Sequence, residues 1–281
     1  MTTKRWRSHV AIASLLLLAA CGGGGSDDLA QTLNLNDDPS STLLMIESGG
    51  GFVPVEFMVG QGPSLVLQRD GTVIAMGPQI EIFPGPLLSN WQTTQLDAET
   101  MLFVLEELDA IGFPTIDSVD NTEITGVADA PTTTVTFYNQ EGDHVFSVYA
   151  LGMESREVTD ARVPVLANLV QELYESGAVG GGQPYVSEAI QVVAGPAEGA
   201  FDPNDPTVNF VDWPLPDAYA GLSETGIEGW RCGSYEGDAA TSLLEIFERA
   251  NQSNIFTEGD ANYRFSVRPL FGGETPCEPV A

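Results

Sequence analysis

The chain has 281 residues, of which 10 are basic and 40 acidic, giving a formal net charge of −30. Such a charge repels phosphate groups, so we expect neither nucleic acid nor an anionic lipid surface as a partner. Hydrophobic residues make up 43% of the chain, and no apolar run after residue 20 is long enough to span a bilayer. The composition therefore predicts a folded globular body with an acidic surface.

The first 20 residues have the layout of an export signal. Three basic residues, Lys4, Arg5 and Arg7, precede an apolar run over residues 10–20. This run is shorter than the roughly 20 apolar residues of a spanning helix, and small residues end it. Because the three bases leave with the signal, the ten basic residues fall to seven, all arginine, and the net charge falls from −30 to −33.

The end of this signal carries a further motif. Leu18, Ala19, Ala20 and Cys21 follow one another, and this order resembles the lipobox of bacterial lipoproteins. The resemblance implies that the Cys21 thiol receives a diacylglyceryl group and that the signal is cut just before it. More than one acyl chain would give stable membrane attachment. Ordinary secretion with a chance cysteine at the cleavage site is the alternative.

Residues 21–41 are rich in glycine, serine, aspartate and asparagine, as in "GGGGSDD" and "NLNDDPSS". Chains of this composition bury little surface, so we expect a flexible stalk. A glycine-rich segment, "SGAVGGGQP" over residues 176–184, then separates two parts of similar size. The predicted organisation is a signal peptide (1–20), a lipidated stalk (21–41), an N-terminal part (42–178) and a C-terminal part (179–281).

The chain has three cysteines, Cys21, Cys232 and Cys277. Lipid would occupy the first, which leaves one pair in an exported chain, where disulfides persist. We therefore predict a disulfide between Cys232 and Cys277, with two unpaired buried thiols as the alternative. A metal site is disfavoured, because two thiols lack further soft ligands nearby.

The N-terminal part alternates hairpins with amphipathic helices. Segments 65–68 and 72–75 flank Asp70-Gly71, a favoured two-residue turn. Asp97 is placed to cap a helix over residues 98–111, and Gly112 is placed to end it. A second hairpin, "TTVTFYN" and "HVFSVYA" around residues 140–143, precedes a helix that Thr159 or Asp160 opens and that runs through Tyr174.

The C-terminal part repeats this pattern more loosely. We expect strands over residues 185–193, 230–235 and 262–270, and a helix capped by Asp238 that runs through Arg249. Strands interrupted by single helices indicate an α+β fold, in which amphipathic helices cover antiparallel sheets of β-hairpins.

Several familiar chemistries are disfavoured by the residues of the processed chain. It keeps one histidine, His144, and no lysine, which excludes lysine nucleophiles and Walker phosphate loops. A Ser-His-Asp site would need His144, and no Gly-x-Ser-x-Gly motif occurs, since Ser234 directly follows Gly233. We interpret His144 as a strand residue and expect no zinc site.

Two acidic segments are weaker candidates. Asp202, Asn204 and Asp205 in "FDPNDPT" could offer oxygens to calcium, but the Asp-x-Asp-x-Asp-Gly loop is absent, so we expect no resident metal. Asp129 in "VADAPTTT" fits a turn better than catalysis.

Three tryptophans, Trp91, Trp213 and Trp230, lie beside proline-rich segments. They could line a carbohydrate or peptide groove, and packing against the core is the favoured reading. Carboxylate pairs of the kind that glycoside hydrolases use remain open, because no one pair stands out among 40 acids.

A wider resemblance covers most of residues 42–277. The segments "DGTVIAMGPQIEIFPGPLL", "VADAPTTTVTFYNQEGDHVFSVYALG" and "RCGSYEGDAATSLLEIFERAN" with "YRFSVRPL" resemble uncharacterised predicted lipoproteins of actinobacteria. The resemblance implies lipid attachment and this architecture, and it assigns no catalytic residue.

The sequence thus predicts an extracytoplasmic lipoprotein, anchored through Cys21 to the outer face of the cytoplasmic membrane, or to an outer membrane where the cell has one. We expect its body to bind or scaffold an envelope protein, peptide or glycan, with no cofactor and no catalytic residue. Two alternatives stay open. One is a carboxylate-dependent hydrolase of envelope glycans or peptides, and the other is a surface inhibitor or immunity-type protein.

Overall fold

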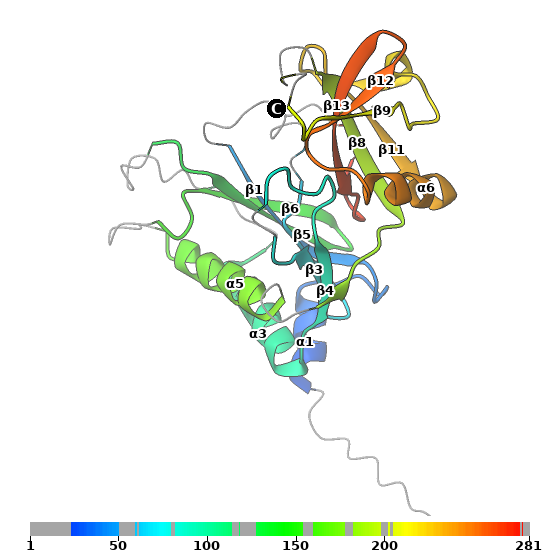
Figure 1. Ribbon diagram of the computed structural model, residues 1–281. Helices are drawn as coiled ribbons and strands as arrows, with labels where there is room; N and C mark the ends of the chain where they lie inside the picture. The colour runs from blue at the N-terminus through cyan, green and yellow to red at the C-terminus, as the bar shows by residue number, and fades with distance from the viewer. Residues whose placement is uncertain are drawn as a thin grey trace, which may run out of the picture.

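A computed structural model describes residues 24–50, 60, 62–79, 82–113, 118, 128–153, 160–177, 182–197, 202, 205–275 and 277. Two β-sheets of seven and six strands form two lobes, and each sheet has helices packed on one face (Figure 1). Nearly all strand pairs are antiparallel, so the predicted α+β fold with two parts of similar size is confirmed.

The first sheet has the strand order β6-β5-β1-β2-β3-β4-β7. Its strands are β1 (Thr42–Gly49), β2 (Leu65–Gln68), β3 (Thr72–Met76), β4 (Trp91–Gln95), β5 (Thr132–Asn139), β6 (Gly142–Tyr149) and β7 (Gln183–Pro184). Both predicted hairpins are present as β2–β3 and β5–β6. Gly71 has a φ of 86° in the first turn, a left-handed conformation that glycine adopts without strain. The central strand β1 was not predicted.

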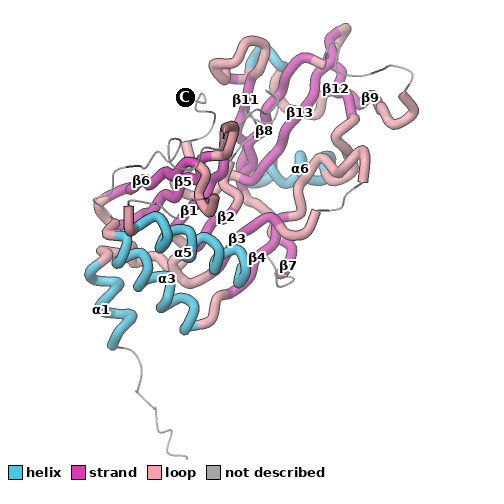
Figure 2. Tube along the Cα trace, turned by 90° about the vertical axis from the view of Figure 1, so that its left-hand side faces the viewer, coloured by secondary structure: helices cyan, strands magenta, loops and turns pink. Residues whose placement is uncertain are grey.

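Helices α1 (Gly24–Thr32), α3 (Ala98–Ile111) and α5 (Arg162–Gly177) cover one face of this sheet (Figure 2). The predicted caps of α3 are confirmed, because Oδ1 of Asp97 accepts the backbone N–H of Thr100 at 2.8 Å and Gly112 ends the helix with a φ of 80°. Before α5, Oδ1 of Asp160 accepts the N–H of Arg162 at 2.9 Å.

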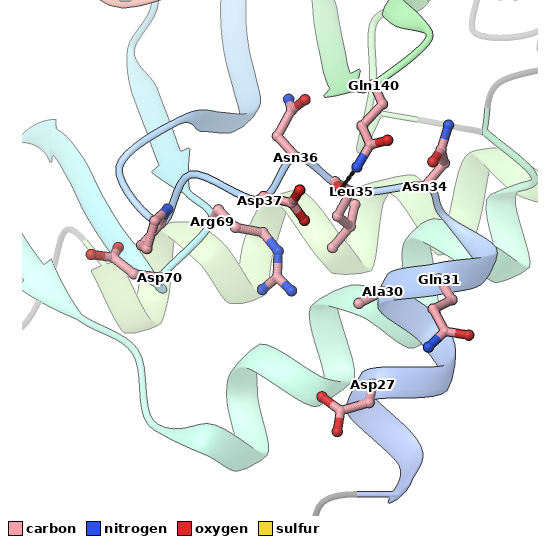
Figure 3. A pocket seen from close by; sticks show the side chains of 11 residues that line it. Asp27, Ala30, Gln31, Asn34, Leu35, Asn36, Asp37, Arg69, Asp70 and Gln140 are labelled. Carbon is pink, nitrogen blue, oxygen red and sulfur yellow. Dashed lines mark hydrogen bonds between the residues drawn. The ribbon is translucent and has the colours of Figure 1, made fainter.

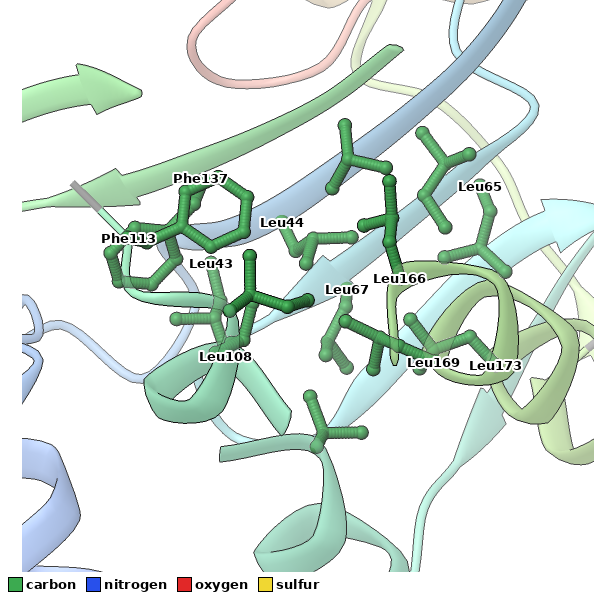
Figure 4. Packing of buried hydrophobic residues seen from close by; sticks show 14 of the residues in the cluster. Leu43, Leu44, Leu65, Leu67, Leu108, Phe113, Phe137, Leu166, Leu169 and Leu173 are labelled. Atoms are coloured by element: carbon green, nitrogen blue, oxygen red, sulfur yellow. The ribbon is translucent and has the colours of Figure 1, made fainter. Parts of the chain in front are cut away.

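The core of the first lobe lies between this sheet and its helices. Leucines of β1 and β2 meet leucines of α3 and α5 (Figure 4). Period-two alternation places Leu44 and Ile46 in this core, while Met45 between them points to the opposite face. The second face of the sheet therefore also carries apolar side chains.

The predicted flexible stalk is wrong for residues 24–41. Residues Gly24–Thr32 form α1, which packs against α3, and the next turn buries Leu33 and Leu35 at 3% and 4% exposure. Burial of these leucines outweighs the polar composition of the segment, because each contributes about 1.5–3 kcal/mol. The folded body therefore includes the segment that leads into β1.

The second sheet has the strand order β10-β11-β8-β13-β12-β9. Its strands are β8 (Ala189–Pro196), β9 (Asn209–Asp212), β10 (Ser223–Glu224), β11 (Arg231–Glu236), β12 (Asn254–Glu258) and β13 (Ala261–Pro269). Helix α6 (Gly237–Phe247) packs on it through Ala240, Leu243 and Phe247. The predicted N-cap of α6 is wrong, because the cap residue is Glu236 and Asp238 lies within the first turn.

Each lobe receives a segment from the other half of the chain. Leu87 and Leu88 precede β4 but pack against the core of the second lobe. Phe271 follows β13 but packs against the first sheet, and β7 pairs with β4. These exchanged segments tie the two lobes together.

Candidate functional site

The predicted lipidation residues Leu18, Ala19, Ala20 and Cys21 lie outside the described residues. Asp27, in the first turn of α1, follows Cys21 by six residues along the chain. Of the helices that the structure describes, none is both long and apolar enough to cross a membrane.

Cys232 on β11 and Cys277 in the C-terminal tail lie at disulfide-bonding distance, with Cα atoms 5.8 Å apart. Cys232 is buried with Val193 and Trp230 on the face of the second sheet opposite α6. The backbone N–H of Cys277 donates to Oε1 of Gln191 at 3.0 Å. This arrangement is consistent with the predicted disulfide.

Two of the three calcium candidates, Asp202 and Asp205, lie among the described residues. Asn204 lies outside the described residues, and Asp202 is exposed. The Asp205 carboxylate accepts the backbone N–H and the hydroxyl of Thr207 at 2.8 and 2.7 Å, and these bonds lower its pKa. Across the described ranges, no three histidine, cysteine or acidic side chains are placed to hold a metal ion.

His144 and Asp129 have structural surroundings at the β5–β6 hairpin. Nε2 of His144 lies 3.1 Å from Oδ1 of Asn139, and its ring stacks on Phe137 at 6.0 Å. Asp129 has a left-handed φ of 62°, and the next backbone N–H donates to the hydroxyl of Tyr149 at 3.0 Å. Neither residue faces a partner suited to nucleophilic or acid–base catalysis among the described residues.

The three tryptophans pack into the lobes, as the favoured reading expected. Trp91 contacts Phe271 across the lobes, and Trp230 is buried on the second sheet. Trp213 is half-buried, and its indole N–H donates to the carbonyl of Asp217 at 2.7 Å.

A buried ionic cluster lies where the C-terminal tail meets the first sheet. Nη1 of Arg268 lies 2.6 Å from Oε1 of Glu274, and the two side chains are 14% and 8% exposed. Burial raises the pKa of the Glu47 carboxyl, the Glu274 carboxylate raises it further, and Arg268 opposes the shift. Burial, reinforced by neighbouring carboxylates, raises the pKa of Tyr138 to about 12.

This cluster is not an open carboxylate pair of the kind that hydrolysis needs. Arg268 binds one oxygen of Glu274, and the other accepts the backbone N–H of Phe271 at 2.8 Å. Both oxygens therefore hold the tail in place, and we assign the cluster a structural role.

An open pocket of about 610 Å³ lies beside α1 (Figure 3). Its walls come from α1, the segment leading into β1, the β2–β3 turn and the β5–β6 turn. The β2–β3 turn is held in place, because the N–H groups of Arg69 and Asp70 donate to the carbonyls of Ser41 and Pro39 at 2.9 Å each. The pocket thus has a defined wall opposite α1, and its volume is within the range of small-molecule sites.

Among the described residues that line this pocket, Arg69 is the one basic side chain. Figure 3 shows its side chain extending into the hollow, with the guanidinium between Asp37 and Asp27 in this view. The Nε atom is buried without a hydrogen-bond partner, and no ion pair holds the guanidinium to any described residue. Three other arginines are ion-paired with acidic side chains: Arg162, Arg231 and Arg268.

A planar guanidinium offers two parallel N–H donors that match a carboxylate. Arg69 is therefore the feature of the pocket best suited to recognition of a bound anion or carboxylate.

Interpretation of the sequence missed this pocket, because most of its wall comes from the segment predicted as a stalk. Leu29, Leu33 and Leu35 are the signal that could have revealed it, since they recur within an otherwise polar segment. Comparison with protein-family models, curated proteins and solved structures found no match to this chain.

Proposed function

We propose that the protein is an extracytoplasmic lipoprotein, held to a membrane by lipid on Cys21, whose acidic body binds a small ligand that carries a carboxylate. The observation that carries the binding role is the unpaired guanidinium of Arg69 in the pocket beside α1. The lipobox, the cysteine pair at bonding distance and the acidic composition support an exported, anchored body.

The pocket would lie close to the membrane in such a protein. Asp27, which lines the pocket, is the sixth residue after Cys21. A fully extended chain of that length spans about 20 Å at most. The ligand would therefore be met near the membrane surface, where the anchor also restricts how the body can turn.

Lipid attachment is tested by expressing the full chain in a bacterium that processes lipoproteins, fed with an alkyne-tagged fatty acid. We expect label on the wild type and none on Cys21→Ser, which would leave the membrane fraction. The Cys232→Ser/Cys277→Ser double variant is the matched control and should keep its label. Label that persists on Cys21→Ser, or an unprocessed N-terminus by mass spectrometry, would overturn the anchor.

Binding is tested on the purified full chain with a panel of small carboxylates, including sugar acids, dicarboxylates, amino acids and short peptides. We expect at least one to bind with a calorimetric signal that Arg69→Gln removes. Arg249→Gln, which removes an exposed arginine after α6, is the control for net charge. If no member of the panel binds, or if both variants bind equally well, the pocket is not the ligand site.

A further inference from the structure

The acidic residues around Arg69 limit which carboxylates can enter its pocket. Asp27, Asp37 and Asp70 line the same hollow as Arg69. The Asp70 carboxylate is already used, since Oδ1 accepts the backbone N–H of Thr72 at 2.9 Å. Within the described part of the chain, no cation pairs with Asp27 or Asp37.

A simple anion would meet three carboxylates for one guanidinium, on a body whose net charge after processing is −33. Like charges at this range oppose binding, and the whole field of the protein slows the approach of anions. A ligand with no net charge avoids this penalty if it carries a cation for the aspartates and a carboxylate for the arginine.

Resting on the function proposed above, we infer that the pocket takes a zwitterionic amino acid or a short peptide with both ends free. Its carboxylate pairs with the Arg69 guanidinium, and its ammonium group lies against Asp37. Asp37 and Asp27 both line the same hollow as the guanidinium, one on either side of it in the view of Figure 3.

The remaining polar lining suits the amide groups of such a ligand. Gln31, Asn34 and Asn36 each bring a side-chain amide to the pocket, with a donor and an acceptor on every one. Gln140 is engaged, because its Nε2 donates to the carbonyl of Leu35 at 2.8 Å. Three amides therefore remain for a peptide backbone or a polar side chain.

The experiment compares four forms of one compound on the purified full chain by calorimetry. The probes are alanine, the dipeptide Ala-Ala, N-acetyl-Ala-Ala, which lacks the ammonium group, and Ala-Ala-amide, which lacks the carboxylate. We expect alanine or Ala-Ala to bind and both blocked forms to bind at least about tenfold more weakly. Comparison of alanine with Ala-Ala then shows whether the pocket takes a free amino acid or a peptide.

Two variants test which side chain binds each charged group of the ligand. Arg69→Gln should weaken the unblocked ligand at least about tenfold and should not weaken Ala-Ala-amide, because that probe has no carboxylate for Arg69 to bind. Asp37→Asn should weaken the unblocked ligand and should not weaken N-acetyl-Ala-Ala, which has no ammonium group for Asp37 to bind. Circular dichroism and thermal unfolding confirm that each variant is folded.

The outcomes separate this inference from the proposed function. If N-acetyl-Ala-Ala or another plain carboxylate binds as tightly as Ala-Ala, and Arg69→Gln abolishes it, the carboxylate site stands and the zwitterion inference is overturned. If Ala-Ala-amide binds as tightly as Ala-Ala, Arg69 does not recognise a carboxylate. The proposed function and the zwitterion inference are then both overturned. If no member of either panel binds, the pocket itself is not a ligand site.

Discussion

The ring of Phe271 lies 5.3 Å from the ring of Trp91, centroid to centroid, and this contact joins the two lobes. Phe271 follows the last strand of the second sheet, whereas Trp91 begins β4 of the first. Met45, Val66 and Ile74 complete the cluster on the face of the first sheet opposite its helices. The C-terminal tail therefore covers part of the face of the first sheet that the helices leave exposed.

Replacement of Phe271 by alanine should destabilise the protein by about 3 kcal/mol, because it removes a buried ring and leaves a cavity between the lobes. Urea unfolding measures this loss. Phe83→Ala removes a ring that is 81% exposed and should change stability by less than about 0.5 kcal/mol. Equal effects of the two substitutions would show that the tail does not hold the lobes together.

The cysteine pair fastens the end of this tail to the second sheet. Cys232 and Cys277 are 45 residues apart, so the chain-entropy model gives a disulfide between them a stabilisation of about 4 kcal/mol. Peptide mapping without reductant should recover the two cysteines as one linked peptide, and reduction should lower the unfolding midpoint. Recovery of both as free thiols in the exported protein would refute the bond.

Local patterns in the sequence were sufficient to predict the elements that neighbouring residues specify. The Asp70-Gly71 turn and the Asp97 and Gly112 caps each depend on a few residues in sequence, and all three were predicted. The β1 strand was missed because its place depends on pairing with β2 and β5, which hydrophobic alternation within residues 42–49 does not reveal. Its buried run of four residues lacks the polar alternation of an edge strand.

The candidate pocket could not be predicted from the sequence for a related reason. Arg69 and Asp27 are 42 positions apart, and only the packing of α1 brings them to one hollow. The packing of Leu87 and Phe271 on the opposite lobe likewise depends on the tertiary structure. In the sequence around each residue, nothing distinguishes it from a core residue of its own lobe. The predicted boundary after residue 178 reflects composition and carries no information about this exchange.

The Glu47 carboxyl should make stability depend on pH. Burial first, and then the Glu274 carboxylate, raise its pKa above the ordinary value of 4.5. The folded state then binds this proton more tightly than the unfolded state does, so the contribution of Glu47 is greatest below pH 4.5. It is lost as the pH rises through the raised pKa. At neutral pH the buried charge costs stability.

Glu47→Gln should therefore be more stable than the wild type at pH 7, and the gain should shrink as the pH falls toward 4 (about half a unit below the ordinary pKa of the carboxyl). Urea unfolding across this range measures the difference. Glu245→Gln changes an exposed carboxylate on α6 and serves as the matched control for net charge. A Glu47→Gln variant less stable than the wild type at pH 7 would show that the attraction of Arg268 outweighs burial.

Gly195 allows the ring of Trp230 to lie directly on β8. A β-carbon added at Gly195 would meet the indole ring, which is 5% exposed and has the Arg264 guanidinium 5.9 Å from its centre on the neighbouring strand. Gly195→Ala should cost about 1–3 kcal/mol, because the ring has no free space into which to move. Gly221→Ala is the control, since its β-carbon would meet only the Asp217 side chain at 3.6 Å. If steric conflict is the cause, Trp230→Leu should remove most of the cost of Gly195→Ala in the double variant; an undiminished cost would place the effect in the β8 backbone instead.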